Sequence, residues 1–464
     1  MDYGRFFITT AIDYLNSVPH IGHAYEKIGA DITARYWRGR GAEVYFLTGT
    51  DEHGAKVAQS ALNKEIKPKE FVDEMADKYK TTWEALNISY DNFVRTTDPG
   101  HEKFVQDFMQ KLYDNGDIYK DKYNGLYCVG CEEYKVVEDL EPGNICPIHK
   151  KECQKIEEEI YFFKLSKYQD QIIEAIQSKK FLIEPETRRN EIFKFIAKET
   201  LRDLAVSRSK VEWGIALPWD SSQTIYVWVD ALLNYISGSK GLWPAQLQLV
   251  GKDIFRFHAI IWPALLIAAG YELPEKLFIH GFLTVNNQKI SKTTGNVIDP
   301  VEIAQIYGAD ALRYFIFREV PFGADGDFSL DRFDSRYRSD LANDLGNLLQ
   351  RTIVMANNSQ VNWTYSQSIK KYPEIDAAME ELKFSEALTL IWKIISELNV
   401  QIDAEKPWVL AKTNPVKNEE ILSGMLSTLS DIAKLIEPFM PETSAKMVAQ
   451  LKNRKPEPLF PRKK

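Results

Sequence analysis

The sequence FFITTAI at residues 6–12 is followed by PHIGHAYEKI at residues 19–28, and together they predict a strand that leads into a helix. The first run is apolar and β-branched and is closed by turn-forming residues at 16–19, which is typical of a buried strand. A buried strand followed by a helix favours an α/β fold. In the second run, apolar side chains recur at helical spacing, at Ile21, Tyr25, Ile28 and Ile32.

Two histidines, His20 and His23, fall at the start of this predicted helix. The free backbone N–H groups and the macrodipole of a helix favour an anion at this end. Gly22 lies between them and has no side chain that could block the close approach of a phosphate. The pattern therefore indicates a phosphate site, although a short HxxH pattern on its own is more often two histidines on a loop.

A second cationic motif, KISKT at residues 289–293, lies past the middle of the chain. It follows the apolar run LFIHGFL at 277–283 and the polar residues 286–288, so we expect it on a loop. Lys289 and Lys292 could stabilise negative charge that builds on a phosphate group in a transition state. The simpler alternative is that the two lysines are only solvated surface residues. The order of the two motifs in one α/β chain makes this alternative less favoured.

Length and composition indicate a large globular protein, because 464 residues are enough for about three domains. The net charge of −8 and the pI near 5.6 give no general positive field, so we expect no DNA partner, and any RNA contact must come from local patches and shape. No apolar run is long enough for a membrane span, and the first strand begins too close to Met1 for a signal peptide. A cytoplasmic location is therefore expected.

The four cysteines of the chain are clustered, which favours a metal site over disulfides and a reducing compartment. Cys128 and Cys131 form one close pair, and Cys146 and His149 form a second pair after a short loop. Three thiolates and one imidazole can hold a single tetrahedral Zn²⁺, and four protein ligands leave no position for a water, so the zinc would be structural. Cys153 could replace His149 as the fourth ligand, although the spacing of Cys146 and His149 mirrors that of the first pair.

The alternation of strands and helices is interrupted at residues 119–217, and strand-like residues return at 224–229. After residue 340, helical spacing dominates. The predicted fold class is α/β: a Rossmann-type parallel-sheet catalytic core, split by a zinc-containing insertion and followed by an all-α helix bundle. The expected divisions are residues 1–118 for the first half of the core, 119–217 for the insertion with its zinc knuckle at about 126–150, 218–285 for the second half of the core, 286–340 for a linking segment with the KISKT loop, and 341–464 for the bundle.

The motifs in this order resemble those of class I aminoacyl-tRNA synthetases, and more narrowly those of the methionyl-tRNA synthetase family. The resemblance covers nearly the whole chain. In the KISKT loop that family often has methionine second and serine last, where this chain has Ile290 and Thr293. The resemblance is carried by PHIGHAY at 19–25, GTDEHG at 49–54, the zinc knuckle, YVWVDA at 226–231, KISKT at 289–293, Asn343, Asn347, Arg351, and Pro407 with Trp408.

The resemblance implies a ligase that activates methionine with ATP and Mg²⁺ to methionyl-adenylate and pyrophosphate. The methionyl group would then pass to the 3′ end of tRNA(Met), including the initiator tRNA. The implied catalytic residues are His20, His23, Lys289 and Lys292, and Gly22 and Ser291 join them in the ATP site. The family also places Lys252 near the active site, although it could equally be a solvated turn residue.

The same resemblance implies a methionine pocket. Asp51 closes the apolar run at 44–47, where α/β sheets place ligand-binding groups, and a carboxylate suits the ammonium of an amino acid. Aromatic walls suit a thioether, although core packing is the ordinary role of an isolated aromatic residue. Near Leu232 the family commonly has proline or another small residue. The implied pocket consists of Ala11, Ile12, Tyr14, Asp51, Trp228, Ala231, Leu232, Tyr235 and His280.

The C-terminal bundle is expected to bind the tRNA anticodon. Asn343, Asn347 and Arg351 are four residues apart and would line one helix face, and Trp408, expected in a loop between helices, could stack on a base. Helix capping and ordinary packing are the alternatives for these residues. The family sometimes carries a further dimerisation domain after the bundle, and this chain stops without one, so a monomer is expected.

Two other functions are compatible with parts of the pattern. A class I core could activate another amino acid or transfer a nucleotidyl group, and a catalytically silent RNA-binding protein could keep the zinc and the bundle. The intact histidines and lysines count against the silent protein. Trp408 and the asparagine face count against a simple nucleotidylyltransferase.

Overall fold

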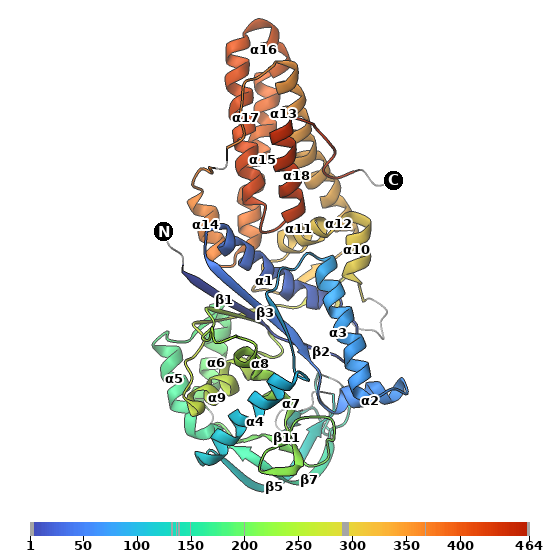
Figure 1. Ribbon diagram of the computed structural model, residues 1–464, viewed down its shortest axis with the longest axis vertical. Helices are drawn as coiled ribbons and strands as arrows, with labels where there is room; N and C mark the ends of the chain where they lie inside the picture. The colour runs from blue at the N-terminus through green and yellow to red at the C-terminus, as the bar shows by residue number, and fades with distance from the viewer. Residues whose placement is uncertain are drawn as a thin grey trace.

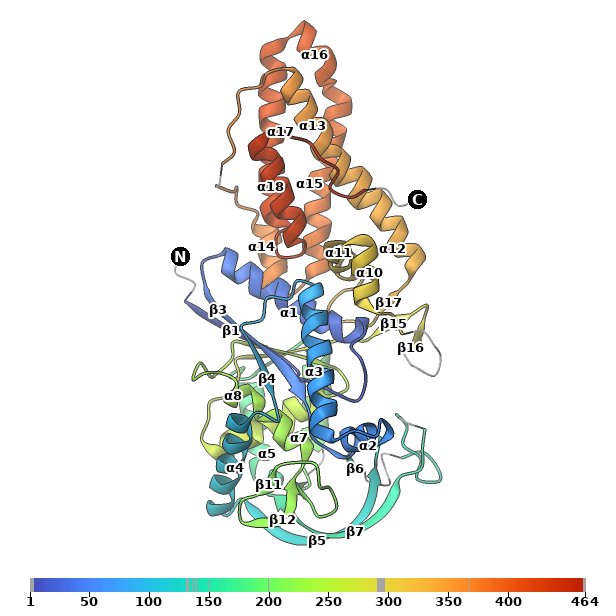
Figure 2. The ribbon, with the colours of Figure 1, turned by 45° about the vertical axis from the view of Figure 1, so that its right-hand side comes forward.

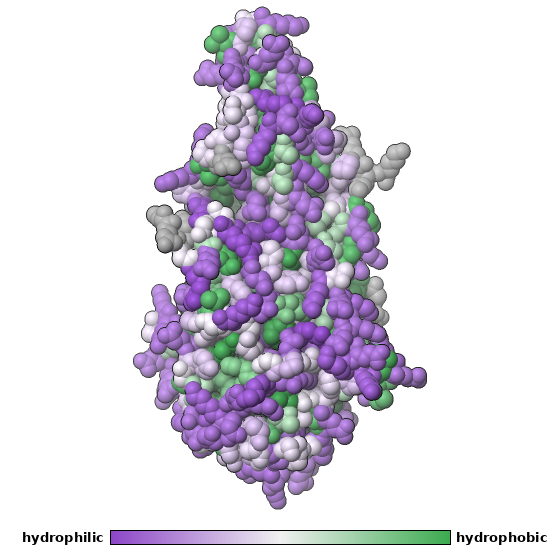
Figure 3. Space-filling model, in the orientation of Figure 1, coloured by the Kyte–Doolittle hydropathy of each residue, from purple (hydrophilic) through white to green (hydrophobic). Residues whose placement is uncertain are grey.

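The computed structural model describes residues 4–130, 133–135, 137, 140–148, 150–198, 200–289, 297–366 and 368–461. The molecule is elongated, with a twisted sheet in the middle, an antiparallel sheet at one end and a helix bundle at the other (Figure 1, Figure 2). The face in Figure 3 is mostly hydrophilic, with hydrophobic residues in small separate patches. In the described ranges, no helix combines the length and the apolar character needed to cross a membrane.

The central sheet is parallel throughout. Among the described residues it has seven strands, in the order β2-β3-β1-β13-β14-β8, with β4 also paired to β3. The first strand predicted from the sequence is confirmed, because its interior residues Phe7 and Ile8 are fully buried. The strands are β1 (Arg5–Thr10), β2 (Asp13–Tyr14), β3 (Glu43–Asp51), β4 (Asn92–Arg95), β8 (Leu182–Glu184), β13 (Leu247–Gly251) and β14 (Lys276–His280).

Helix α1 (Ile21–Gly39) begins directly after His20, as the apolar spacing predicts. Ile21, Ile28 and Ile32 are fully buried, so this face of the helix packs into the core. In Figure 1, α1 runs between the central sheet and the bundle. The other helices of the core are α2 (Ala55–Asn63), α3 (Pro68–Ala85), α4 (Pro99–Asp114), α7 (Val227–Leu232), α8 (Asn234–Ser237), η3 (Phe257–Ile261), α9 (Trp262–Ala269), α10 (Pro300–Tyr307) and α11 (Ala309–Glu319).

Residues 224–229 do not form a single strand. Strand β12 (Asp220–Ile225) ends at Ile225, and α7 begins two residues later. The carbonyl of Tyr226 accepts hydrogen bonds from the N–H groups of Val229 and Asp230 and closes the first turn. The β-branched and aromatic residues favour a strand locally, but Asp230 pairs with two histidines from other elements, and these contacts outweigh the propensity. The predicted strand is therefore wrong over residues 227–229.

The segment predicted as an insertion contributes most of the strands of two small antiparallel sheets. One is a long hairpin of β5 (Ile118–Cys128) and β7 (Gln154–Phe163), extended by β6 (Glu133–Lys135) and β9 (Leu204–Ala205). However, β8 also lies in this segment and pairs with β14 at the edge of the central sheet, so the division at 119–217 stays a prediction. The remaining elements are η2 (Leu165–Tyr168), α5 (Gln169–Gln177), α6 (Glu186–Lys198), β10 (Ser207–Arg208) and β11 (Ala216–Leu217).

The C-terminal region is a helix bundle, as the periodicity predicts. Leu388, Ile391 and Ile395 are fully buried along one face of α15. A short sheet of β15 (Leu283–Val285), β16 (Gln288–Lys289) and β17 (Gly326–Phe328) precedes the bundle. The helices from this sheet onward are α12 (Leu330–Arg336), η4 (Tyr337–Gly346), α13 (Asn347–Asn358), α14 (Pro373–Glu380), α15 (Phe384–Glu405), α16 (Pro407–Thr413), α17 (Pro415–Leu435) and α18 (Pro441–Asn453).

A buried arginine joins the bundle to the core. Arg313 of α11 is fully buried, and its Nη2 lies 2.6 Å from Oδ2 of Asp31 on α1. Its guanidinium also donates to the carbonyls of Pro438 and Phe439, which follow α17. A buried charge needs this full set of partners to offset its desolvation. These contacts fix one face of helix α1 to the bundle.

Candidate active site

Several predicted site residues stand at one edge of the central sheet. Asp51 is the last residue of β3, His280 is the last residue of β14, and Ala11 directly follows β1. These strands are close neighbours in the sheet, and all of them are parallel. Their carboxyl ends therefore meet at one edge, which is where open α/β sheets bind ligands. The N-terminus of α1 follows β1 at the same edge.

The two histidines at the start of α1 cap the helix with their rings. The N–H of Gly22 donates to Nδ1 of His20 at 3.1 Å, and the N–H of His20 donates to Nδ1 of His23 at 3.2 Å. Burial, with help from the nearby His20 and Lys27, holds the pKa of His23 well below its usual value. His23 is thus neutral at physiological pH. Because its Nδ1 accepts a hydrogen bond, its proton is on Nε2, where it can be donated.

The second motif lies mostly outside the described residues. Ser291 and Lys292 belong to residues 290–296, and of Lys289 only the backbone in β16 is described. Lys252, which the family places near the active site, forms an ion pair with Asp325, its Nζ lying 2.8 and 2.5 Å from the two carboxylate oxygens. It also lies over the ring of Phe282, so it has specific partners.

Helix α7 presents the aromatic wall of the predicted methionine pocket. Trp228 is half-buried and stacks on Phe257, with ring centroids 4.1 Å apart and an interplanar angle of 15°. Ala231 and Leu232 follow in the same helix and are buried. Trp228, Leu232 and Tyr235 pack in one hydrophobic cluster. The structure therefore brings these predicted residues together.

Tyr235 is held by a histidine that the sequence reasoning missed. The Nδ1–H of His258 donates to the carbonyl of Ile254 at 3.0 Å, so its Nε2 must accept from the Tyr235 hydroxyl at 2.7 Å. Burial lowers the pKa of His258 to about 4 and raises that of Tyr235 well above its usual value. Both groups are neutral, so the hydrogen bond fixes the orientation of the Tyr235 ring without a charge.

The segment that follows the first strand packs against two different clusters. Ala11 and Tyr14 pack against the cluster that contains Trp228, whereas Ile12 packs against a separate cluster around Phe7 and Tyr45. Consecutive side chains of an extended segment point to opposite sides, which explains the separation. The structure thus does not bring the Ile12 side chain to the other predicted pocket residues.

A buried network of four ionisable groups lies beneath this edge of the sheet. The Nζ of Lys27 lies 3.0 Å from Oδ1 of Asp13 and 2.9 Å from Oε1 of Glu26, and it donates to the carbonyl of Ala11 at 2.7 Å. The other oxygen of Glu26 lies 3.0 Å from Nε2 of His280. None of the four side chains is more than 8% exposed. Helix α1 thereby holds two predicted pocket residues, Ala11 and His280.

Among these four groups, Asp13 has the fewest polar partners to stabilise its charge. Lys27 is shared between two carboxylates, and Glu26 also has His280. Within the described residues, Oδ2 of Asp13 has no hydrogen-bond partner. Burial raises the pKa of Asp13 to about 7, although the charge of Lys27 works against this rise. The sequence reasoning missed Asp13, Glu26 and Lys27, although the last two directly follow the PHIGHAY motif.

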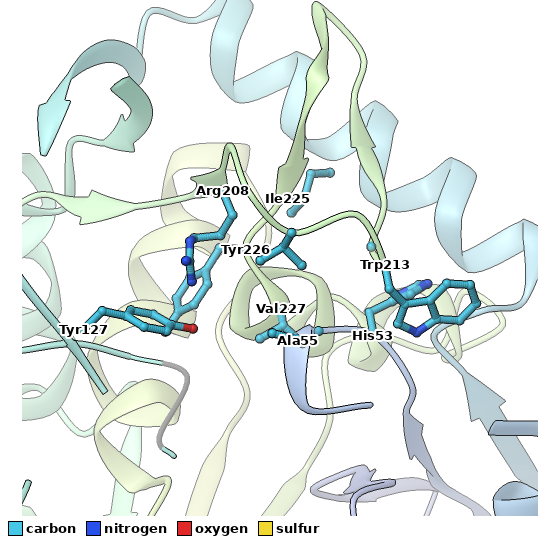
Figure 4. A pocket seen from close by; sticks show the side chains of 11 residues that line it. His53, Ala55, Tyr127, Arg208, Trp213, Ile225, Tyr226 and Val227 are labelled. Carbon is cyan, nitrogen blue, oxygen red and sulfur yellow. The ribbon is translucent and has the colours of Figure 1, made fainter. Parts of the chain in front are cut away.

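A narrow pocket lies between the core and the long hairpin (Figure 4). Trp213 and His53 are side by side at one end, their ring centroids 5.5 Å apart, and Arg208 lies over the ring of Tyr127 at the other end. Its free volume of about 10 Å³ has room for about one water molecule. It includes none of the nine predicted methionine residues. A wider groove of about 510 Å³ adjoins it at Trp213.

The predicted zinc knuckle is described only in part. Cys131 and His149 lie outside the described residues, and the described ones alone complete no metal site. Cys128, Cys146 and Cys153 are buried in one cluster. Burial and these two neighbouring thiols raise the pKa of Cys153, and the thiol of Cys128 is its hydrogen-bond partner. Thiolates are soft donors that suit Zn²⁺, so the residues present fit such an ion.

The predicted anticodon residues lie on the surface of the bundle. Asn343, Asn347 and Arg351 are exposed, and Nδ2 of Asn347 lies 3.4 Å from Oδ1 of Asn343, which shows that the two amides are neighbours. Arg351 lies 3.5 Å from Asp403. Trp408 is 47% exposed and lies in the first turn of α16, not in a loop as expected, because Pro407 starts a helix at that point. In Figure 1, α16 is at the tip of the bundle.

Family models match almost the whole chain. The one described as tRNA synthetases class I (M) matches residues 6–157 and 135–353, and the one described as the anticodon-binding domain of tRNA ligase matches residues 362–460. The first covers the central sheet and the candidate site, and the second covers most of the helix bundle.

Relatives and solved structures agree with these matches. The methionine–tRNA ligase of Clostridium perfringens is 45% identical, covering 96% of this chain and 73% of that protein. The methionine–tRNA ligase of Rickettsia bellii is 43% identical, covering 98% and 94%. The Mycobacterium tuberculosis methionyl-tRNA synthetase in complex with methionyl-adenylate is 35% identical, with a TM-score of 0.91 and complete coverage of both chains. Because the matched family model, the identity, the coverage and the fold all agree, this chain belongs to the methionine–tRNA ligase family of class I tRNA synthetases.

Proposed function

We propose that this chain activates methionine with ATP and then transfers the methionyl group to the 3′ end of tRNA(Met) for translation. The observation that carries the proposal is the full-length similarity to methionine–tRNA ligases, including the TM-score of 0.91 to a structure that contains methionyl-adenylate. The placement of Asp51, His280 and the α1 N-terminus at one edge of the sheet supports it.

In the first step, a carboxylate oxygen of methionine attacks the α-phosphorus of ATP. The new O–P bond gives methionyl-adenylate, and the bond to the bridging oxygen breaks and releases pyrophosphate. The phosphates would lie at the N-terminus of α1, near Gly22, where a neutral His23 can donate its Nε2–H without carrying a charge. Lys289, Ser291 and Lys292 would act on the leaving pyrophosphate, as would His20. Mg²⁺ bound with ATP would neutralise part of the phosphate charge.

The methionine pocket would place polar groups at one end and apolar groups at the other. Asp51 would hold the ammonium group, because a carboxylate forms a strong charge-assisted hydrogen bond to it. Trp228, Leu232 and Tyr235, which pack in one cluster, would enclose the thioether. Ala11, Ile12, Tyr14, Ala231 and His280 complete the set carried over from the family, and of these Ile12 has the weakest structural support.

In the second step, a ribose hydroxyl at the 3′ end of tRNA attacks the methionyl carbonyl, and AMP leaves. The bundle would select the tRNA through its anticodon. The exposed face of Asn343, Asn347 and Arg351 offers amides and a guanidinium to unpaired bases, and the half-exposed Trp408 offers a ring for stacking. The initiator tRNA would share this recognition. We further propose that the chain acts as a monomer in the cytoplasm, with the domain divisions given above.

A structural zinc is the proposed role of the knuckle, with Cys128, Cys131, Cys146 and His149 as ligands and Cys153 as the competing fourth ligand. Wild-type protein purified without chelator is expected to contain about one zinc per chain by mass spectrometry. Cys146→Ser is expected to lose it and to lower the thermal midpoint, because metal binding contributes directly to folding. His149→Ala and Cys153→Ser, measured side by side, show which of the two is the ligand. Wild-type protein without zinc that is unaffected by chelator would contradict the proposal.

The overall function is tested by aminoacylation of purified tRNA with labelled methionine. Attachment of methionine to tRNA(Met), and not to a tRNA with another anticodon, is the expected result. Adenylate formation without transfer to any tRNA would favour a nucleotidyl-transfer enzyme. Specific tRNA binding without either step would favour the catalytically silent RNA-binding protein.

A further inference from the structure

Asp230 is a buried carboxylate with two histidine partners that the proposed mechanism does not use. Its side chain is 1% exposed. The Nδ1–H of His53 donates to its Oδ2 at 2.8 Å, and the Nε2–H of His101 donates to its Oδ1 at 2.8 Å. Both carboxylate oxygens are therefore satisfied by rings that come from other elements. His101 is in turn fixed by the hydroxyl of Ser237, which lies 2.6 Å from its Nδ1.

These contacts join the elements that carry the two sides of the predicted methionine pocket. His53 follows β3 and is two residues from Asp51, which would hold the methionine ammonium. Asp230 lies in α7, two residues from Trp228, which would enclose the thioether. His101 lies in α4 and Ser237 lies in α8, which is also the helix that contains Tyr235. Asp230, His53, His101 and Ser237 thus form a clamp. Three of them, His53, Asp230 and Ser237, are within two residues of a predicted pocket residue, but the clamp itself is formed only by the fold.

We propose that Asp230 is a positioning residue, which sets the distance between Asp51 and Trp228 by pairing with His53 and His101 and so determines the affinity for methionine. This inference rests on the proposed function, because it assumes that methionine binds between these two residues. A shift of one wall by a fraction of an ångström weakens every contact to a bound side chain. The N-terminus of α1, where ATP would bind, belongs to a different element from each of the clamp residues.

The clamp also makes methionine affinity depend on pH. Burial alone would lower the pKa of His53, but Asp230 raises it, with help from Glu102, whose carboxylate lies 3.9 Å from Nε2, and from Glu52. Burial would likewise raise the pKa of Asp230, but His53 and His101 lower it. The pocket beside His53 is lined by Tyr127, Arg208 and Trp213 (Figure 4). As pH rises through the raised pKa of His53, the ion pair becomes a hydrogen bond from a neutral imidazole to the Asp230 carboxylate, and methionine should bind more weakly.

The test is the Asp230→Asn variant, assayed by methionine-dependent ATP–pyrophosphate exchange between pH 6 and pH 9. We expect KM for methionine to rise about tenfold or more and KM for ATP to stay within about twofold. The increase of KM for methionine with rising pH, which we call the pH step, should disappear. Asp107→Asn removes an exposed carboxylate on α4 and serves as the matched control, with wild-type KM values expected. A wild-type KM for methionine with an unchanged pH step in Asp230→Asn would overturn the proposal.

A milder variant covers the case in which Asp230→Asn does not fold. Ser237→Ala removes one hydroxyl from the clamp and should raise KM for methionine about two- to fivefold, with kcat retained. Titration of the tryptophan fluorescence with methionine separates the two proposals. Absence of methionine binding by the wild type would contradict the proposed function, whereas normal binding by the wild type and equal binding by both variants would contradict only the clamp.

Discussion

Replacing both His23 and Lys292 by alanine is expected to lower methionine-dependent ATP–pyrophosphate exchange by at least about 10³-fold, because single electrostatic contacts to a transition state are each worth about 10²–10³-fold. His23 is neutral and donates from Nε2 at the N-terminus of α1, and Lys292 would bring a positive charge to the departing pyrophosphate. The expected loss is in kcat, since these contacts strengthen as charge moves onto the pyrophosphate.

The variant must be shown to keep its fold and its methionine site. His23 also accepts a hydrogen bond at the helix cap, so a loss of about 1 kcal/mol in unfolding free energy is expected from that contact. Binding of methionine, followed by tryptophan fluorescence, should be unchanged. Lys69→Ala, an exposed lysine on α3, is the control for removing a lysine and should keep full activity. Exchange within about tenfold of wild type in the double variant would contradict the proposed roles.

Replacing Lys27 by methionine is expected to destabilise the protein by about 3–5 kcal/mol, which is the usual cost of removing one partner of a buried ion pair. Lys27 is 1% exposed and is the only cation within hydrogen-bond distance of Asp13 among the described residues. Its loss also frees the Ala11 carbonyl, so KM for methionine should rise. Lys69→Met, where the pair with Asp73 is exposed, should cost less than about 1 kcal/mol.

The pH dependence of this loss follows from Asp13. The folded-state pKa of Asp13, about 7, is above its usual value of 3.8, so its contribution to stability falls as pH rises through about 7. Without Lys27, the charged form of Asp13 is still less favourable in the folded protein. The thermal midpoint of Lys27→Met should therefore fall further below that of the wild type at pH 8 than at pH 5.5. Adding Asp13→Leu should restore part of the loss, because an apolar pair replaces the orphaned charge. An equal midpoint shift for Lys27→Met and Lys69→Met at both pH values would contradict this account.

Local sequence patterns predicted the parts of the fold that depend on periodicity. The first strand, the helix that begins after His20, and the buried face of α15 all follow from apolar spacing. The location of Asp51 at the end of a strand also follows, because it closes an apolar run. Each of these features depends on residues that are close together in the sequence, where propensity and spacing carry the information.

The features that could not be predicted depend on contacts between distant residues. Lys27 and Asp13 look like solvated charges in the sequence, but the fold buries them together. Asp230 meets histidines 177 and 129 positions away, and these contacts convert a strand-like sequence into α7. Strand β8 joins the central sheet from within a segment whose sequence indicates an insertion. A single sequence contains no direct signal for such pairings, since each residue has its ordinary local role.

The most direct test of the central claim is amino-acid-dependent ATP–pyrophosphate exchange by the wild-type protein with zinc and magnesium supplied, comparing methionine with cysteine, leucine, isoleucine and valine. The proposed pocket predicts strong exchange with methionine and little with the other four. Exchange driven by another amino acid would contradict the pocket built around Asp51 and Trp228, and no exchange by the folded protein would contradict the proposed activation of methionine itself.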